Sequence, residues 1–377
     1  MDFIKREWLT LTTEAEISVF WPAKGIPEYH AMVWLTDPIC DTAEQFHQIE
    51  TTIKLVQADL QEAVLVWKRY FVSDAINQSV FIKSGINAAV SIVQQPPLNG
   101  TKVAVWLYFV PQVHLTKDMQ CTIMEHSCYR HLFHTQLHSQ GVDEANQTEA
   151  MFNQYIQLIA TKGCTLEKNC QRTWVFVQNV DTHYAGMVVS RRKCFERERL
   201  TPDTHFIAST GIEGKYILPE VLVFMDAYAV QGLKPEQIQY LYAPTHLCPT
   251  YRYGVTFERG TVIHYGDRRH VFVSGTASIN HRGEIEYPMN VIKQADRMFE
   301  NIQTLLGEAG MDMNDVAHLI IYLRDISDYE TIVSYMNQHY PQIPQVIVWA
   351  PVCRPGWLVE AECMAIKEIE DKRFEVY

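Results

Sequence analysis

Two glutamates, Glu360 and Glu362, stand near the end of the chain in the segment CRPGWLVEAE, residues 353–362. The apolar residues around them are typical of a buried strand. Because side chains alternate along a strand, both carboxyl groups share one face while Val359 and Ala361 take the other. Burial in a cleft raises the pKa of a carboxyl group, which then can donate a proton near neutral pH. We therefore consider Glu360 as a general acid, and as an alternative a glutamate that only pairs with an arginine across a domain interface.

A general acid needs a bound substrate, and the chain offers arginines that bind anions. A guanidinium group holds a carboxylate through two parallel hydrogen bonds. Arg354 is the strongest candidate because it shares a motif with Glu360. The alternating charges of RRKCFERER, residues 191–199, are also typical of a solvated or interface-bridging stretch. The candidate arginines are Arg354, Arg252 in the motif YRYG, and Arg191 or Arg192 in the motif SRRKCF.

Two further motifs complete the predicted binding site. In YRYG, Tyr253 is expected at the rim of a cleft, where its hydroxyl can bond to a substrate. In STGIEG, residues 209–214, Thr210 and Gly211 belong to a glycine-punctuated stretch whose backbone N–H groups can face an anion. A plain turn explains that stretch equally well.

A histidine-rich segment, EHSCYRHLFHTQLHSQ, is the rival site. If the segment were helical, His134 and His138 would share a face at a spacing that can bind a metal. No HExxH pattern or other standard zinc motif is present, so we predict no metal site. The chain also lacks GxxxxGK and a strand–GxGxxG–helix unit, so we predict no cofactor. The segment's other histidines are His126 and His131.

The composition excludes several classes of protein. The chain has 377 residues and a net charge of −12, which disfavours binding to nucleic acid by bulk electrostatics. No apolar run approaches the roughly 20 residues that cross a bilayer, and the N-terminus lacks a signal-peptide pattern. Nine cysteines without CxxC pairs indicate reduced thiols. We expect a cytoplasmic protein that acts on a small molecule.

Hydrophobic periodicity predicts three similar units. The last has helices at 290–310, where apolar residues recur at helical spacing up to Gly310, and at 329–340. The unit reads ββαβαββ over roughly 257–367, and four of its strands are predicted at 270–279, 316–325, 345–352 and 357–366. The first and middle segments weakly repeat this order of strands and helices. The first has strands and a predicted helix at 42–63, and the middle one has a predicted helix at 149–163. The predicted units are 1–112, 113–250 and 251–377.

Four stretches of the last unit carry a resemblance to a known family. They are VSGTASINHRGEI, QADRMFENIQTLLGEAG, DVAHLIIYLRDISDYETIVSYMNQHYP and LVEAECMAI. With them the last unit resembles the RidA/YjgF superfamily of reactive-intermediate deaminases, also called the endoribonuclease L-PSP family. This resemblance implies a mixed sheet with two helices on one face, and trimers with ligand clefts between subunits. We therefore expect an α/β (α+β) fold of tandem RidA-like, or chorismate-mutase-like, units that form an intramolecular pseudo-trimer and stay monomeric.

A second set of motifs extends over residues 149–367: RTWVFVQNVD, GMVVSRRKCF, ASTGIEG, YRYGVTFERG, VSGTASI and CRPGWLVEAE. Across this range the sequence also resembles the chorismatases, or chorismate hydrolases. The resemblance implies that Glu360 protonates the enolpyruvyl ether of chorismate or a related anion, without a cofactor, and that pyruvate leaves. It places Cys353 near the acid. The substrate-binding set that we predict is Arg354, Cys353, Tyr253, Arg252, Thr210, Gly211 and Arg192.

Two other functions stay open. Deaminases of the superfamily bind the substrate carboxylate through an arginine that closely follows a proline before the penultimate strand. This chain has Gln345 there, which disfavours deamination of enamines or imines. The other alternative is a protein of the same fold that binds a small molecule without turning it over.

Overall fold

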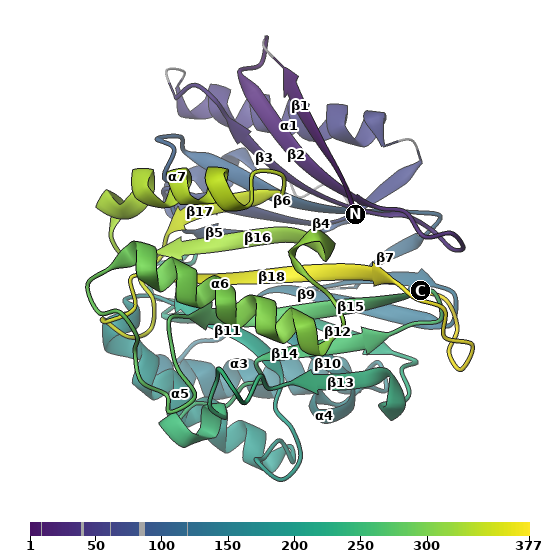
Figure 1. Cartoon of the computed structure of the whole chain (residues 1–377), viewed down its shortest axis with the longest axis vertical. Coiled ribbons are helices and arrows are strands. Elements are labelled where there is room, and N and C mark those ends of the chain that lie inside the picture. Colours follow the sequence, from purple (N-terminus) through teal and green to yellow (C-terminus); the bar gives the residue numbers. More distant parts are fainter. Residues whose placement is uncertain (9, 39–40, 61, 83–86, 119) are drawn as a thin grey trace.

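Three mixed sheets of six strands each make up the protein (Figure 1). The structure, a computed structural model, describes residues 1–8, 10–38, 41–60, 62–82, 87–118 and 120–377. In each sheet the strands lie in the order first, second, third, sixth, fourth and fifth. The fourth and fifth strands pair in parallel and the other neighbours are antiparallel. This identical topology confirms the predicted tandem repeat of one α/β unit.

The first sheet confirms the predicted helix and adds two N-terminal strands. Helix α1 (Thr42–Asp59) ends sooner than predicted because β4 already begins at Ala63. A short helix α2 (Ala75–Gln78) and the 3₁₀ turn η1 (Ser79–Phe81) stand where the other units have a long second helix. Strand β5 lies within the segment INAAVSIVQQ, residues 86–95, whose first position is outside the described residues. The strands are β1 (Asp2–Trp8), β2 (Thr13–Phe20), β3 (Glu28–Leu35), β4 (Ala63–Val72), β5 (Ala89–Gln94) and β6 (Val103–Pro111).

The second sheet departs most from the sequence-based expectation. Helix α5 (Val180–Arg197) was not predicted, and the histidine-rich segment forms the strands β8 and β9 rather than a helix. Helix α3 (Glu144–Ala160) confirms the predicted middle helix. The other elements are β7 (His114–Asp118), β8 (Cys121–His126), β9 (Tyr129–His138), α4 (Leu166–Asn169), β10 (Cys170–Val177), β11 (Ala208–Glu213) and β12 (Val223–Gln231).

The third sheet contains all the predicted strands and both helices, α6 (Val291–Glu308) and α7 (Tyr329–His339). One more strand, β13 (Ile238–Leu241), precedes them and lies before the predicted unit boundary at residue 251. The remaining strands are β14 (Gly260–His264), β15 (Arg268–Ala277), β16 (Val316–Leu323), β17 (Gln345–Trp349) and β18 (Val359–Glu368). Short 3₁₀ turns are η2 (Pro235–Gln237), η3 (Thr250–Tyr253), η4 (Met313–Asp315) and η5 (Ile326–Asp328).

The first long helix of every unit begins with the same local signal. Asp41, Asp143 and Asn290 each precede a helix and accept a hydrogen bond from the backbone N–H three residues on. That bond satisfies one of the N–H groups that a helix start leaves unpaired. At the other end of α6, Gly310 adopts a positive φ of 69°, which a glycine accepts at little cost.

The three sheets close into a ring in which each unit contacts the other two. Strand β5 contacts β9, β11 contacts β15, and β16 contacts β3. The inner faces meet on aromatic side chains, where the rings of Trp67, Trp106 and Trp174 lie 5.7–6.3 Å apart. The helices lie away from this centre, with α1 at one end of the molecule and α3 and α5 at the opposite end (Figure 1). No helix among the described residues is long and apolar enough to cross a membrane.

A buried ion pair connects the two units at each of the three interfaces. The pairs have N–O distances of 2.6–2.9 Å, and their side chains are almost fully excluded from solvent. Charges this deep are costly unless each finds its partner, so the pairs specify how the sheets dock. They are Arg69–Asp226 between the first and second units, Arg172–Glu362 between the second and third, and Arg268–Glu28 between the third and first.

Removing one partner tests this account of docking. Arg268→Ala removes the arginine that pairs with the buried carboxylate of Glu28 and leaves it with His270 and Tyr108. We expect a loss of about 3–5 kcal/mol in the free energy of unfolding. Chemical denaturation followed by circular dichroism measures the change. The control is Arg373→Ala, since Arg373 pairs with Asp371 at the surface, and there we expect no measurable change. Equal stability of the two variants would contradict the role given to Arg268.

Candidate functional site

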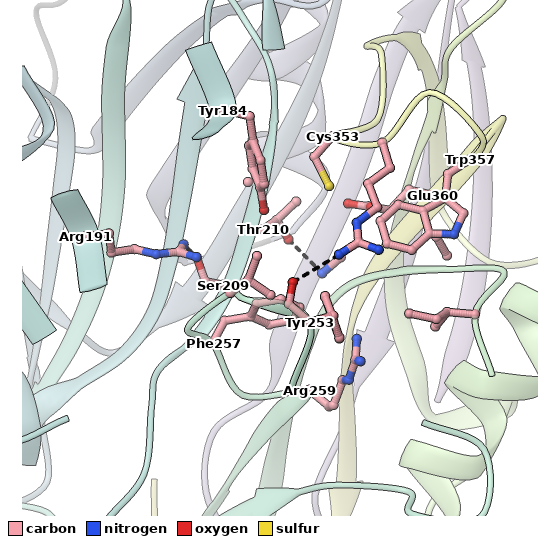
Figure 2. Close-up of a pocket in the computed structure, with 16 residues that line it drawn as sticks. Tyr184, Arg191, Ser209, Thr210, Tyr253, Phe257, Arg259, Cys353, Trp357 and Glu360 are labelled. Atoms are coloured by element: carbon pink, nitrogen blue, oxygen red, sulfur yellow. Dashed lines mark hydrogen bonds between the residues drawn. The ribbon is translucent and has the colours of Figure 1, made fainter. Parts of the chain in front are cut away.

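A pocket lies between the second and third units (Figure 2). Strand β11 and helix α5 supply one wall, and β15, β18 and the segments 253–259 and 353–357 supply the other. The space is about 510 Å³, counting the mouth that opens to solvent.

Glu360 is the acid in this pocket. Its position on β18 turns the side chain toward the second unit, and only 5% of the residue is exposed. Burial raises the pKa of its carboxyl group to about 8, and the negative charge of Glu362 adds to the rise. No described residue forms an ion pair or a hydrogen bond with this carboxyl group. Glu360 is therefore mostly protonated at neutral pH.

A glycine makes room for that carboxyl group. Gly275 on β15 faces Glu360 so closely that a Cβ atom there would lie 2.2 Å from Glu360 Oε1. Any larger residue at position 275 would push the acid out of its place. The motif VSGTAS therefore needs its glycine for close packing against Glu360.

Glu362 has a different environment although it lies on the same face of β18. Arg172 Nη2 donates to Glu362 Oε2 over 2.8 Å, and Trp174 Nε1 donates to Oε1 over 2.6 Å. Both oxygens of the carboxylate thus have a charged or polar donor. Glu362 pairs with Arg172 across the interface between two units. This pairing is the alternative role that we considered for Glu360.

Thr210 connects the ion pair to the pocket. Its Oγ1 accepts from the backbone N–H of Gly275 over 2.9 Å, the contact dashed in Figure 2, and from Arg172 Nη2 over 2.5 Å. A hydroxyl has two acceptor lone pairs and one proton. Because both lone pairs are in use, the hydroxyl proton of Thr210 is left to donate to a ligand in the pocket.

Arg191 reaches the pocket from α5 and is 1% exposed. Its Nη1 has a long contact of 3.5 Å to Ser209 Oγ, while Nε and Nη2 have no partner within the described part of the chain. Burial lowers the pKa of this guanidinium group. A buried cation with free donors beside a cavity is a strong site for an anionic ligand group.

Two more arginines lie on the wall of the third unit. Arg354 Nη2 donates to the backbone oxygen of Tyr253 over 3.2 Å, and its guanidinium carbon lies 4.8 Å from the Tyr253 ring and 5.2 Å from the Trp357 ring. Arg259 stacks on the same Tyr253 ring at 5.3 Å. Aromatic rings thus hold both guanidinium groups in place and leave them close enough to receive carboxylates.

Tyr184 and Cys353 form a neutral hydrogen-bonded pair at the side of the pocket. Burial raises the pKa of the Cys353 thiol to about 12 and that of the Tyr184 hydroxyl well above its usual value. A thiol that stays protonated is a poor nucleophile, so Cys353 shapes the pocket rather than attacking a substrate. In Figure 2 the Tyr184 hydroxyl points into the pocket toward Cys353 and Thr210.

The structure brings together six of the eight residues that the sequence indicated. Glu360, Arg354, Cys353, Tyr253, Thr210 and Gly211 all line the pocket. Arg252 is exposed outside it, and Arg192 donates to the backbone oxygen of Gly254 instead. These two arginines are not in the pocket because the backbone turns their neighbours, Tyr253 and Arg191, inward.

Sequence reasoning missed Arg259 and Tyr184 and left Arg191 undecided. A signal for Arg191 was available in the spacing of α5, where Met187, Arg191, Cys194 and Phe195 fall on one face and are buried. An arginine in the middle of an apolar helix face must point inward. The glutamate of STGIEG, Glu213, also has a structural role, because its carboxylate accepts the N–H groups that begin α5.

The histidine-rich segment forms no metal site in the described residues, where no group of three or more His, Cys, Asp or Glu side chains converges. The expectation that His134 and His138 share a helix face is wrong, because both lie on β9. His134 packs edge-on against Tyr155, and His131 bonds to the Tyr228 hydroxyl over 2.7 Å. Alternation along β9 puts His131 and His134 on opposite faces, and the register of β9 shifts between His134 and Leu137. His126 belongs to the neighbouring β8.

Comparison with known proteins identifies the family. The model of the family described as endoribonuclease L-PSP matches residues 261–367. A RutC family protein of Pyrococcus abyssi is 32% identical over 101 residues, which cover 26% of this chain and 79% of that protein. The chain belongs to the RutC, or endoribonuclease L-PSP, family. A RutC family protein of Pyrococcus horikoshii is 29% identical over 101 residues, again 26% of this chain and 79% of that protein.

The family matches concern the last unit of this RutC family chain, whereas one solved structure matches nearly all of it. The crystal structure of a chorismatase superposes with a TM-score of 0.67 at 17% identity, and covers 91% of this chain and 100% of the chorismatase chain. The likeness shows a shared fold. The predicted resemblance to the RidA/YjgF superfamily and to the chorismatase fold is confirmed.

The protonation of Glu360 can be measured directly. Infrared difference spectra between the natural protein and Glu360→Gln should show the C=O stretch of a protonated carboxyl group that disappears with a midpoint at about pH 8. In Glu362→Gln the midpoint should move to lower pH, because the neighbouring negative charge that favours the neutral acid is gone. A midpoint near the ordinary pKa of 4.5 in the natural protein would refute this account of Glu360.

Proposed function

We propose that this protein hydrolyses the enolpyruvyl ether of chorismate or a related compound and releases pyruvate, with Glu360 as the general acid. The observation that carries the proposal is the joint presence, in one pocket, of a buried acid whose pKa lies at about 8 and of the buried, unpaired guanidinium group of Arg191. The fold that the chain shares with a chorismatase supports it. No cofactor is needed for this chemistry.

The charges of the pocket suit a dicarboxylate. The chain as a whole has a net charge of −12, so binding of an anion needs a local cluster of cationic side chains. Arg191 on the α5 wall and Arg354 with Arg259 on the opposite wall provide that cluster. Chorismate has one carboxylate on its ring and one on its enolpyruvyl group. Binding the two at opposite walls would place the double bond between them, near Glu360.

The reaction begins with a proton transfer. The Glu360 carboxyl group donates its proton to the terminal methylene carbon, and the electrons of the double bond form the new C–H bond. Positive charge develops on the ether-bearing carbon, where the ether oxygen shares it as an oxocarbenium ion. The carboxylate that Glu360 has become faces this cation and stabilises it.

Water completes the hydrolysis. Its oxygen bonds to the cationic carbon and its proton passes to the Glu360 carboxylate, which restores the acid. The bond between the hemiketal carbon and the ether oxygen attached to the ring then breaks. That oxygen takes up the proton of the hemiketal hydroxyl and becomes the ring alcohol. One substrate molecule and one water thus give one ring alcohol and one pyruvate. The Thr210 hydroxyl, with its proton free to donate, would hold a carboxylate or the incoming water.

Glu360→Gln tests the acid. Glutamine keeps the shape but cannot donate the proton, so we expect kcat to fall by about 10²–10⁴-fold with a far smaller change in substrate affinity. Pyruvate release from chorismate measures the rate. In the natural protein kcat/KM should decline above about pH 8, where Glu360 loses its proton.

Glu362→Gln is the comparison variant on the same face of β18, and its fold is checked by circular dichroism because it also removes the carboxylate that pairs with Arg172. It keeps the acid but lowers the pKa of Glu360, so we expect the alkaline decline of kcat/KM to move to lower pH while turnover persists in mildly acidic solution. If Glu362→Gln abolishes turnover and Glu360→Gln does not, the acid is assigned to the wrong glutamate.

Arg354→Ala tests carboxylate binding. Loss of a charge-assisted contact should weaken binding by about 1.5–3 kcal/mol, seen as a higher KM with a smaller change in kcat. The control is Arg282→Ala, an exposed arginine in the hairpin after β15 that does not line the pocket, and we expect it to leave KM unchanged. An unchanged KM in Arg354→Ala would remove this residue from the binding set.

The first experiment is incubation of the purified protein with chorismate, with pyruvate and the ring product followed together. Release of pyruvate supports the proposal. Saturable binding of chorismate without release of pyruvate indicates a binding protein. In a separate incubation with an enamine or imine substrate, release of ammonia indicates a deaminase. Either of these two outcomes would overturn the proposed hydrolysis.

A further inference from the structure

A second cleft lies between the third and first units. Strand β17 and helix α7 form one wall, and β2, β3 and β6 form the other. The space within it is about 630 Å³ with its open mouth. No part of the proposed function uses this cleft.

Strand register shows that the two clefts occupy equivalent places in the repeat. The fourth strand of each unit has a β-bulge, which allows β10 and β16 to be aligned residue by residue. Through their pairing with the fifth strands, Gln345 on β17 is then equivalent to Ser209 on β11, and Val346 is equivalent to Thr210. All four residues line their clefts. The second cleft is therefore the first one repeated with other side chains.

The charged side chains at equivalent positions differ between the two clefts. On the sixth strands, Ala104 of β6 stands where β18 has Glu360, so the acid is absent. Counted from Phe272 and His30, which precede the bulge of β15, the strand registers put Glu16 at the position that Arg259 holds in the third unit. The cleft that suits anions has an arginine there, and this cleft has a carboxylate.

Glu16 and Gln345 each have an unused acceptor atom, and both residues line this cleft. Glu16 accepts the backbone N–H of Gln345. Among the described residues, Glu16 Oε2 and Gln345 Oε1 are both buried and have no hydrogen-bond partner. Buried acceptors without donors are costly, and a ligand with two N–H groups would satisfy both.

We propose that this cleft binds a small organic cation with a flat apolar body, an amidinium or a primary ammonium compound, through Glu16 and Gln345. The rest of the lining fits such a body, because Trp34, Tyr329 and Met336 supply aromatic and apolar surface. A cation close to the face of Trp34 gains further attraction. The site is independent of the chemistry proposed for the first cleft.

The electrostatics around Glu16 set the conditions for a test. Burial raises the pKa of Glu16 to about 7, Glu14 on the same strand adds to the rise, and Lys5 from β1 opposes it. A cation needs the ionised form, so binding should strengthen as the pH rises through about 7. Binding is best measured at about pH 8, where most Glu16 is a carboxylate.

Benzamidine is the probe, because its flat ring carries an amidinium with two parallel N–H groups. Isothermal titration of the full chain should show one saturable site, and Glu16→Gln should weaken it by about tenfold or more. Benzamide, which has a similar shape but no charge, should bind far less. Glu14→Gln removes the same charge from the same strand outside the cleft, and should change the affinity by about twofold at most.

Glu360→Gln separates this site from the first cleft, and benzamidine should bind that variant as it binds the natural protein. Three results would overturn the proposal: no saturable benzamidine binding, equal weakening by Glu14→Gln and Glu16→Gln, or loss of binding in Glu360→Gln. None of them bears on whether chorismate is hydrolysed, so the two proposals stand or fall separately.

Discussion

Desolvated charge at the interfaces between units is the constraint on which the structure depends. Moving an ion out of water costs several kcal/mol, which only a well-placed partner offsets. Each interface of the ring meets this condition with one arginine–carboxylate pair, so a shift of one sheet against another would strand two charges at once. The pairs thereby fix the geometry of the clefts that lie beside them. They are Arg69–Asp226, Arg172–Glu362 and Arg268–Glu28.

Glu360 has a raised pKa because it is buried beside one of these ion pairs but has no arginine partner of its own. It shares a strand face with Glu362, yet Arg172 and Trp174 donate to Glu362 alone. An unpaired buried carboxyl group lowers its cost by keeping its proton, and the paired charge of Glu362 favours the neutral form further. The two glutamates differ in chemistry because of their neighbours, since their strand, face and burial are alike.

The parts that the sequence could predict are those that local pattern determines. The apolar spacing of α6 with its stop at Gly310, and the alternation on β18 that puts Glu360 beside Glu362, were both visible. Helix α5 was missed because its inner face holds a buried arginine. The choice between Arg191 and Arg192 depended on the phase of that helix. The strands of the histidine-rich segment were hidden because β9 turns polar residues toward other units, so its alternation of polar and apolar residues is weak.

Joining three units in one chain removes a restriction that a symmetric trimer imposes. When three identical subunits assemble, every cleft has the same residues, and a substitution that suits one cleft appears in all three. Here the backbone registers are repeated while the side chains differ, so Arg259 and Glu16 can occupy one position with opposite charge. The acid likewise appears once, since its equivalents are Ala104 and Phe224. One fold can thus keep a protonated acid among arginines in one cleft and present a carboxylate for a cation in another.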